Sequence, residues 1–197
     1  MTTRISIAAT LIFIMTMTPP VLAQVVSASM NEAIQLSLKG KNDEAITIIK
    51  GIIAREPQNF FAYNNLGVIY MSMGKHDLAI EVYEASLKIN PDFVMTLNNM
   101  GQLYKDVGKY DLAENYLKKA IFLFPDMDLA HSGLGEVHFL QKHYDDAVIH
   151  HKRSVDLKPD QAKYHQLLAK SYQAKHMDVE AQMEFNEYER LKRNSHE

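Results

Sequence analysis

Hydrophobic and polar positions along the chain recur with a period of 34 residues. The recurrence is plainest between the segment from Tyr63 to Tyr83 (YNNLGVIYMSMGKHDLAIEVY) and the segment from Leu97 to Leu117 (LNNMGQLYKDVGKYDLAENYL). Asn-Asn, Gly, Tyr, Gly-Lys and Asp-Leu-Ala keep the same register in both. The period divides the chain into five repeats, 26–59, 60–93, 94–127, 128–161 and 162–195. Such a period is typical of proteins whose repeats stack and bury a continuous core.

Each repeat carries two apolar stripes, which predict two helices. With the first residue of a repeat numbered 1, positions 4, 7, 8 and 11 fall within about 100° of one another on a helical wheel. Positions 20, 24 and 27 form the second stripe, as Ala79, Tyr83 and Ser86 do in repeat two. Between the stripes stands a glycine suited to a left-handed helix end, and near the end of a repeat stands a proline that stops the second helix. These residues are Gly40, Gly74 and Gly108, and Pro57, Pro91, Pro125 and Pro159. We therefore predict antiparallel helix pairs that stack along the chain.

The columns resemble those of the tetratricopeptide repeat family. Repeat two carries the family pattern most fully, through Tyr63, Leu66, Gly67, Tyr70, Ala79, Tyr83 and Pro91. The resemblance implies an all-α fold, a right-handed α-solenoid of antiparallel helix pairs (a tetratricopeptide superhelix), whose concave groove holds a peptide. It extends over all residues after the N-terminal segment. Repeat one departs from the pattern at Ser29 and Glu32, and repeat five at Glu189, as is expected of terminal repeats with one face in water.

The N-terminal residues 1–23 form a different kind of segment. Arg4 precedes an apolar run of 13 residues, Ile5 to Met17, which Pro19-Pro20 and then Val21-Leu22-Ala23 follow. This layout predicts a bacterial Sec-type signal peptide cleaved before Gln24, a mature tetratricopeptide domain of residues 24–197, and a periplasmic or secreted protein. The alternative is an uncleaved anchor, although the run is shorter than the roughly 20 residues that span a bilayer. Any membrane contact is expected only through this segment.

Composition removes several classes of function. The net charge is −3 and no basic stripe stands out, so nucleic acid is not an expected partner. The chain has no cysteine, which excludes disulfides, thiolate metal sites and a cysteine nucleophile. No phosphate-binding loop, nucleophile elbow or metal-binding helix motif is present. We therefore predict that the protein is not an enzyme, with no catalytic residue, no cofactor and no small-molecule substrate.

The remaining positions of the first helices predict a binding groove. Positions 2, 5, 6, 9 and 12 point roughly 150° away from the core stripe. Side-chain amides there offer both a donor and an acceptor to the backbone of an extended peptide, and Met or Phe can take its apolar side chains. An open alternative is that the asparagines only shape the helix or hold water. The predicted groove residues are Asn31, Phe61, Asn64, Asn65, Met71, Met95, Asn98, Asn99, Gln102 and Phe139.

Histidines are the unusual part of the composition. Four of them fall in core columns of repeats four and five, namely His131, His138, His151 and His165. Either they fill space in place of a tyrosine and stay neutral, or they bind a metal, since imidazole is a common ligand. His131 and His138 lie two turns apart, too far for one ion without other ligands, so no metal ligand is assigned. His150 and His151 are adjacent and should point to different faces.

The sequence thus predicts an exported adaptor that binds a partner protein or peptide in the concave groove, in the assembly of a cell-envelope or secretion complex. The alternative is a metal- or pH-responsive binding protein that uses the histidine cluster of repeats four and five.

Overall fold

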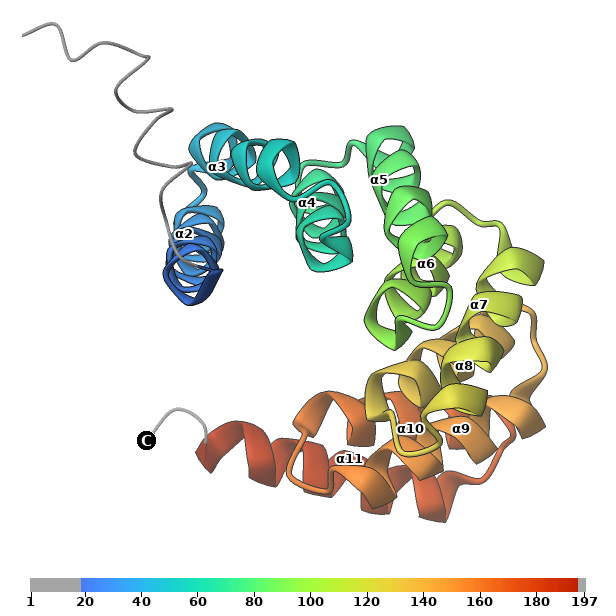
Figure 1. Ribbon diagram of the computed structural model, residues 1–197. Helices are drawn as coiled ribbons and strands as arrows, with labels where there is room; N and C mark the ends of the chain where they lie inside the picture. The colour runs from blue at the N-terminus through green and yellow to red at the C-terminus, as the bar shows by residue number, and fades with distance from the viewer. Residues whose placement is uncertain (1–18, 195–197) are drawn as a thin grey trace, which may run out of the picture. The chain divides into compact units, whose positions relative to one another are not determined.

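The structure is a computed structural model that describes residues 19–194, and in this range every regular element is an α-helix (Figure 1). The helices are α2 (Pro19–Leu38), α3 (Asn42–Arg55), α4 (Phe60–Ser72), α5 (His76–Ile89), α6 (Val94–Asp106), α7 (Tyr110–Leu123), α8 (Asp128–Leu140), α9 (Tyr144–Leu157), α10 (Ala162–Ala174) and α11 (Asp178–Asn194). The fold is an all-α helical-repeat solenoid, as the stripes predict.

The helices keep the period of the sequence. The even-numbered helices, α2 to α10, are the first helices of their repeats and are called the A helices below. The odd-numbered helices are the B helices, and they begin 34 residues apart, at Asn42, His76, Tyr110, Tyr144 and Asp178. The A helices of repeats two to five likewise begin at the first residue of each repeat. One pattern of apolar positions therefore produces one helix pair per repeat.

The turn inside each pair has a constant geometry even where glycine is missing. Backbone φ is positive at Gly40, Gly74 and Gly108, and also at Lys142 (65°) and His176 (57°), which occupy the same position in repeats four and five. In every repeat the next amide donates to the carbonyl five residues earlier, over 2.8–3.0 Å, from Lys41, Lys75, Lys109, His143 and Met177. This bond is the Schellman closure of a helix end. Because a side chain at positive φ costs on the order of 1 kcal/mol, helix packing and not glycine alone sets the turn in repeats four and five.

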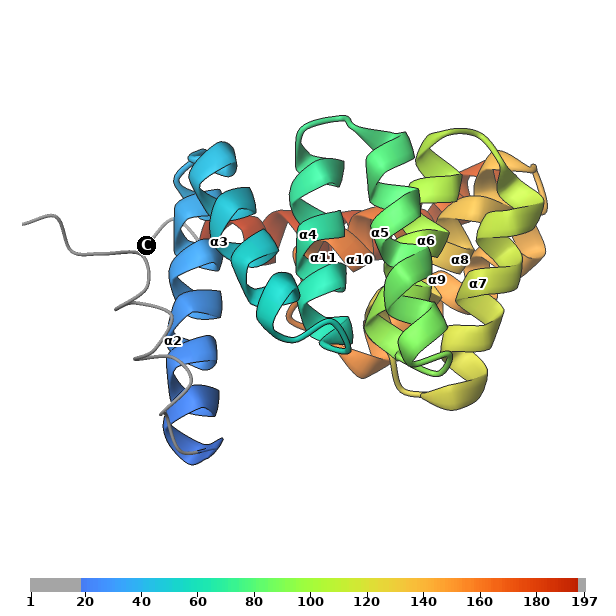
Figure 2. The same ribbon diagram turned by 45° about the horizontal axis from the view of Figure 1, so that its top comes forward.

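The chain divides into two compact units, an N-terminal unit of residues 1–82 and a C-terminal unit of residues 83–197, and each is described by itself. In the N-terminal unit α2 packs beside α3, and α3 packs on α4 (Figure 2). Ala33, Ala45, Ile49 and Ile52 are buried there. The apolar stripes of the first two repeats thus form the core of this unit.

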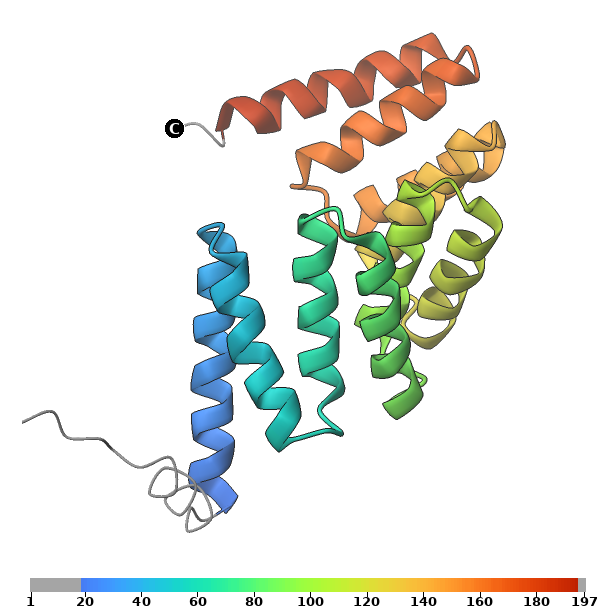
Figure 3. The same ribbon diagram turned by 90° about the horizontal axis from the view of Figure 1, so that it is seen from above.

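In the C-terminal unit the pairs α6–α7, α8–α9 and α10–α11 are antiparallel, and α7 also packs on α8 as α9 does on α10 (Figure 3). The fully buried side chains include Leu97, Met100, Leu103, Leu117, Leu134 and Leu168. Small residues let the paired helices touch, because a Cβ added at Gly101 would lie 2.5 Å from Leu117 Cγ. The core of this unit therefore runs along the stripes predicted from the sequence.

The two ends of the described chain differ from its middle. Residues 1–18 of the predicted signal segment lie outside the described residues, and 19–23 form the first turn of α2, where a leading proline is well tolerated. Among the described helices, none combines the length and apolar character that crossing a membrane requires. At the other end, α11 buries none of its residues, and its Val179, Met183 and Phe185 are exposed. The helix α11 is therefore the least buried of repeat five, in keeping with the departure of Glu189 from the pattern.

Candidate binding face and histidine cluster

The A helices of the C-terminal unit carry two adjoining clefts. One, of about 270 Å³, lies over α6, α8 and the start of α10, and it is lined by Asn98, Gln102, Leu129, Ser132, Glu136, Gln161, Lys163 and Tyr164. The other, of about 140 Å³, is lined by Glu136, Phe139, Leu140, His151, Leu167 and Lys170. Because Glu136 borders both, we call this surface, together with the exposed Met95 on α6, the A-helix face of the C-terminal unit.

An ion network links the three A helices on this face. Lys105 Nζ lies 2.9 Å from Glu136 Oε2, and Lys163 Nζ lies 3.2 Å from Glu136 Oε1. Lys105 also donates to Gln102 Oε1 over 2.9 Å. Burial alone would raise the pKa of Glu136, but hydrogen bonds and charges from the two lysines outweigh it, so its pKa lies below the ordinary value. Glu136 is therefore ionised at neutral pH and ties α6, α8 and α10 together.

The network joins positions 12, 9 and 2 of successive repeats, which are 31 and 27 residues apart in the chain. The sequence analysis did not predict that Lys105 and Glu136 pair. A search for opposite charges at those two separations could have found the pair.

The predicted groove asparagines differ in how far they reach the surface. Asn64 and Asn98 are buried, 7% and 3% exposed, so position 5 does not face solvent. For Asn98 the physical reason is that α8 packs against α6 and covers this side of the helix. Its Nδ2 lies 3.5 Å from Asn99 Oδ1, and its own Oδ1 has no hydrogen-bond partner. Asn65 donates to the carbonyl of Phe61 over 2.9 Å, so this amide is bonded within its own helix.

The apolar groove residues do reach the surface. Phe61, Met95 and Leu129 hold position 2 of successive repeats and are 53%, 44% and 47% exposed. Phe139 is half-buried against Tyr144, with ring centroids 5.5 Å apart. Position 2 is therefore exposed and apolar in three repeats, and in the C-terminal unit Met95 and Leu129 are called the exposed apolar row below.

The predicted groove residues divide between the two units. Asn31, Phe61, Asn64, Asn65 and Met71 belong to the N-terminal unit, where Asn31 and Phe61 are exposed and Met71 is half-buried. Met95, Asn98, Asn99, Gln102 and Phe139 belong to the C-terminal unit. There the structure brings Asn98 and Gln102 into the larger cleft and Phe139 into the smaller one.

Four histidines form a chain of rings between α8 and α9. His150 lies between His131 and His138, with ring centroids 5.4 and 5.6 Å away, and His143 lies 6.1 Å from His138. His131 and His150 share a hydrogen bond between their Nδ1 atoms, 3.1 Å apart. Sequence analysis singled out His131 and His138 but missed His143 and His150 as their neighbours. The positions of His138 and His150 are held in repeat three by Tyr104 and Tyr116, whose ring centroids lie 5.6 Å apart. A comparison of these two positions between repeats could have predicted the contact of His150 with His138.

The other two core histidines are also buried and hydrogen-bonded. His151 Nδ1 lies 2.8 Å from Ser171 Oγ on α10, so His150 and His151 do point to different neighbours. His165 Nδ1 lies 2.6 Å from Glu184 Oε2, and its Nε2 lies 3.0 Å from the carbonyl of Pro159. All four histidines of the core columns are therefore part of the packed interior.

Burial keeps several of these imidazoles neutral. It lowers the pKa of His138 below its ordinary value. Burial, helped by the neighbouring His131 and His138, lowers the pKa of His150 to about 4. Burial lowers the pKa of His151 to about 4 as well. These three rings therefore carry no charge at neutral pH.

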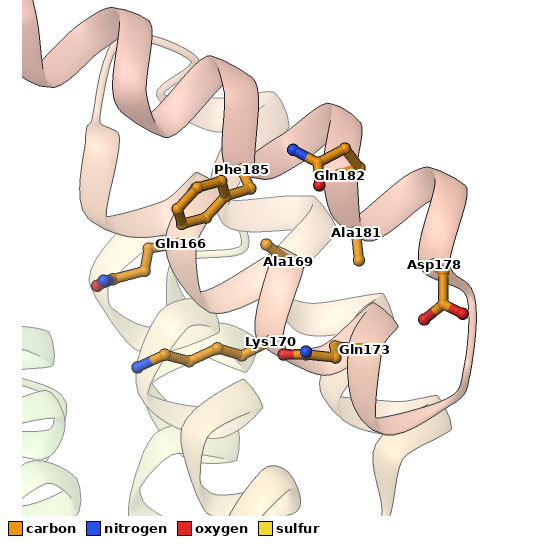
Figure 4. Close-up of a pocket in the computed structure, with 8 residues that line it drawn as sticks. All are labelled: Gln166, Ala169, Lys170, Gln173, Asp178, Ala181, Gln182 and Phe185. Atoms are coloured by element: carbon orange, nitrogen blue, oxygen red, sulfur yellow. The ribbon is translucent and has the colours of Figure 1, made fainter.

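A further cleft of about 420 Å³ opens between α10 and α11 and is shown in Figure 4. Its lining consists of Gln166, Ala169, Lys170, Gln173, Asp178, Ala181, Gln182 and Phe185. Amide and aliphatic groups prevail, and the two charged side chains stand at its border (Figure 4). All of its lining residues belong to α10 and α11.

Comparisons with known proteins agree with this architecture. Two family profiles described as tetratricopeptide repeat match residues 60–93 and 98–162. No curated protein matches the chain. Among solved structures, PilF from Pseudomonas aeruginosa is similar with a TM-score of 0.80 and 19% identity, over 86% of this chain and 77% of that one. MamA (residues 41 to the end) from Desulfovibrio magneticus RS-1 is similar with a TM-score of 0.73 and 22% identity, over 86% and 96%.

At these identities the structural neighbours show the fold, and the two profiles show the family. The chain belongs to the tetratricopeptide repeat family and is a helical-repeat scaffold of the protein-interaction class.

Proposed function

We propose that this protein is an exported adaptor that binds an extended segment of a partner protein on the A-helix face of the C-terminal unit. The observation that carries the proposal is the exposed apolar row at position 2, Met95 and Leu129, of which Leu129 lines the larger cleft together with amide and charged groups. Apolar side chains left in water gain most when a partner covers them. Gln102 and the ion network around Glu136 supply polar groups along the same surface.

The process we propose for the adaptor is assembly of a cell-envelope or secretion complex. The support is chemical: the chain has exposed apolar groups that a partner could cover, and its sequence contains no recognised catalytic motif. Such a scaffold acts by positioning partners rather than by converting substrates.

Site-specific photo-crosslinking tests the binding surface and identifies the partner. A photoreactive residue at position 129 in the intact protein should give a crosslinked partner in the producing cells, because that side chain lies on the A-helix face. The same residue at position 122 is the control, since Phe122 on α7 is 83% exposed but lies outside this face. A product that forms from 122 and is absent from 129 would place the partner on the B helices and contradict the proposal.

Export is the other part of the proposal. We expect the mature protein to begin at Gln24, because Val21-Leu22-Ala23 follows the apolar run in the way a signal peptidase requires. Cleavage there shortens α2 (Pro19–Leu38) to residues 24–38. Intact mass of the protein from the periplasmic fraction measures the start directly. Recovery of the full-length mass from the membrane fraction alone would indicate an uncleaved anchor instead.

A further inference from the structure

Repeat four differs from repeat three at three positions that meet around the helix-pair turn. Positions 11, 16 and 19 are Tyr104, Lys109 and Leu112 in repeat three. In repeat four the same positions are His138, His143 and Asp146. In repeat three the contact is a cation over a ring, with Lys109 Nζ 5.9 Å from the Tyr104 centroid. Repeat three thus has no histidine or carboxylate at these positions, whereas each of the three residues in repeat four offers a ligand atom for a metal ion.

The turn holds the three groups close together. The amide of His143 donates to the carbonyl of His138 over 2.8 Å, which fixes the two backbones relative to each other. The helix α9 begins directly after His143, and Asp146 stands in its first turn. One ligand atom from each side chain lies within 4.8 Å of the others. The cluster is therefore built by the repeat geometry and needs no movement of the backbone to meet.

His138 supplies a second observation that points to a ligand. Its side chain is buried, 6% exposed, and its Nδ1 has no hydrogen-bond partner. A buried polar atom without a partner is uncommon, and an ion is one of the groups that satisfy it. The two other members are exposed, so their rotamers can change at small cost.

We propose that His138, His143 and Asp146 form a binding site for a divalent first-row transition-metal ion, with zinc as the best fit. Two imidazoles and one carboxylate suit Zn²⁺, whereas Ca²⁺ and Mg²⁺ prefer oxygen ligands alone. Tetrahedral bonds of about 2.0–2.1 Å place ligand atoms about 3.4 Å apart. Rotation of the exposed His143 and Asp146 side chains can shorten the present separations of up to 4.8 Å between ligand atoms to this value. Three protein ligands leave one position for water or for a group of a bound partner.

Charged side chains around His138 both favour and oppose the binding of a cation. Glu114 on α7 and Asp146 on α9 act on His138 with negative charge, which favours a cation. Lys118 on α7 and a protonated His143 oppose it, and Lys118 is paired with Glu114. His150 stacks on His138 with planes 18° apart and so limits rotation of that ring.

Zinc titration of the intact protein tests the site. We expect Tm to rise with zinc concentration, because an ion that binds only the folded state stabilises it by mass action. Calorimetric titration should give one ion per chain, and magnesium should give no rise. The double variant His143→Lys with Asp146→Leu installs the repeat-three residues at exposed positions. It should keep its helical circular dichroism and lose the zinc-dependent rise.

The matched control is His176→Gln, which removes another exposed histidine and should leave the zinc response unchanged. Cobalt gives an independent readout, since a site with two imidazoles and a carboxylate should produce visible absorption in the wild type and none in the double variant. An unchanged zinc response in the double variant would overturn the proposal, because the ion would then bind elsewhere. A wild-type protein whose Tm does not change in a large excess of zinc would overturn it as well.

Discussion

Acidification from pH 7 to pH 4 should remove about 3 kcal/mol of the free energy of unfolding through His151 alone. Its pKa falls from 6.5 to about 4 in the folded protein, mainly because the ring is buried. Each pKa unit corresponds to about 1.4 kcal/mol of difference between the two protonation states. Between these two values the unfolded chain binds a proton that the folded protein does not, so stability falls as pH falls through this window. Well below pH 4 both states are fully protonated and His151 causes no further loss.

The groups that face His151 come from several helices. Glu136 on α8 and the Ser132 backbone favour its charged form, whereas His150 on α9 and Lys163 on α10 oppose it. Ser171 on α10 holds Nδ1 at 2.8 Å. Burial away from water outweighs the contacts that favour the charged form, and the pKa of His151 is therefore lowered.

A repeat-based variant provides the control for the acid effect. The positions of His151 and Ser171 are held by Leu117 and Val137 one repeat earlier, and both are fully buried. The double change His151→Leu with Ser171→Val removes both polar partners together, so no buried group is left unpaired. We expect this variant to be as stable as wild type or more so at pH 7, with a shallower decline toward pH 4. Urea unfolding at several pH values measures both, and an identical decline in the two proteins would contradict the assignment to His151.

Truncation of the apolar row should weaken partner binding more than tenfold. Full burial of a Leu or Met side chain contributes about 1.5–3 kcal/mol. Met95 and Leu129 are 44% and 47% exposed, so a covering partner gains roughly half of this from each, about 1 kcal/mol. The double change Met95→Ala with Leu129→Ala therefore removes about 2 kcal/mol, and about 1.4 kcal/mol already corresponds to tenfold. Stability should change by no more than about 0.5 kcal/mol per site, as at other surface positions.

Tyr70→Ala separates loss of binding from loss of fold. Tyr70 is 6% exposed, and truncation of a buried aromatic side chain costs about 3–5 kcal/mol. This variant should lose partner capture only together with its helical circular dichroism and its Tm. The apolar-row variant should lose capture while both stay near the wild-type values.

The fold could be predicted from the sequence because its signal is periodic and local. Every helix pair repeats the same stripes, and the turn residues mark the break between them, as at Gly74 and Gly108. The turns of repeats four and five could not be predicted in the same way, because Lys142 and His176 adopt positive φ at the position where the other repeats have glycine. There the packing of neighbouring helices overrides local preference.

The candidate site was predicted only in part, because a helical wheel describes one helix alone. It placed Met95 at the surface, where the structure also has it, yet it also placed Asn98 there, which the neighbouring helix α8 covers. Contacts between helices were missed for the same reason. The ion network around Glu136 and the approach of His143 and Asp146 to His138 join positions that no single-helix pattern relates. Comparing the columns of repeats three and four points afterwards to His138, His143 and Asp146, whereas the ion network needs a search across repeats.

We propose that the A-helix face of the C-terminal unit binds the partner. The most direct test of this claim is the dissociation constant of the crosslink-identified partner for wild type, for Met95→Ala with Leu129→Ala, and for Phe122→Ala with Ile149→Ala. The last variant is the matched control, because Phe122 and Ile149 are exposed apolar residues of B helices, 83% and 61% exposed. We predict a rise of more than tenfold for the first variant, about 1.4 kcal/mol or more, and no significant change for the control. Equal affinity of wild type and the apolar-row variant, or a loss confined to the control, would contradict the claim.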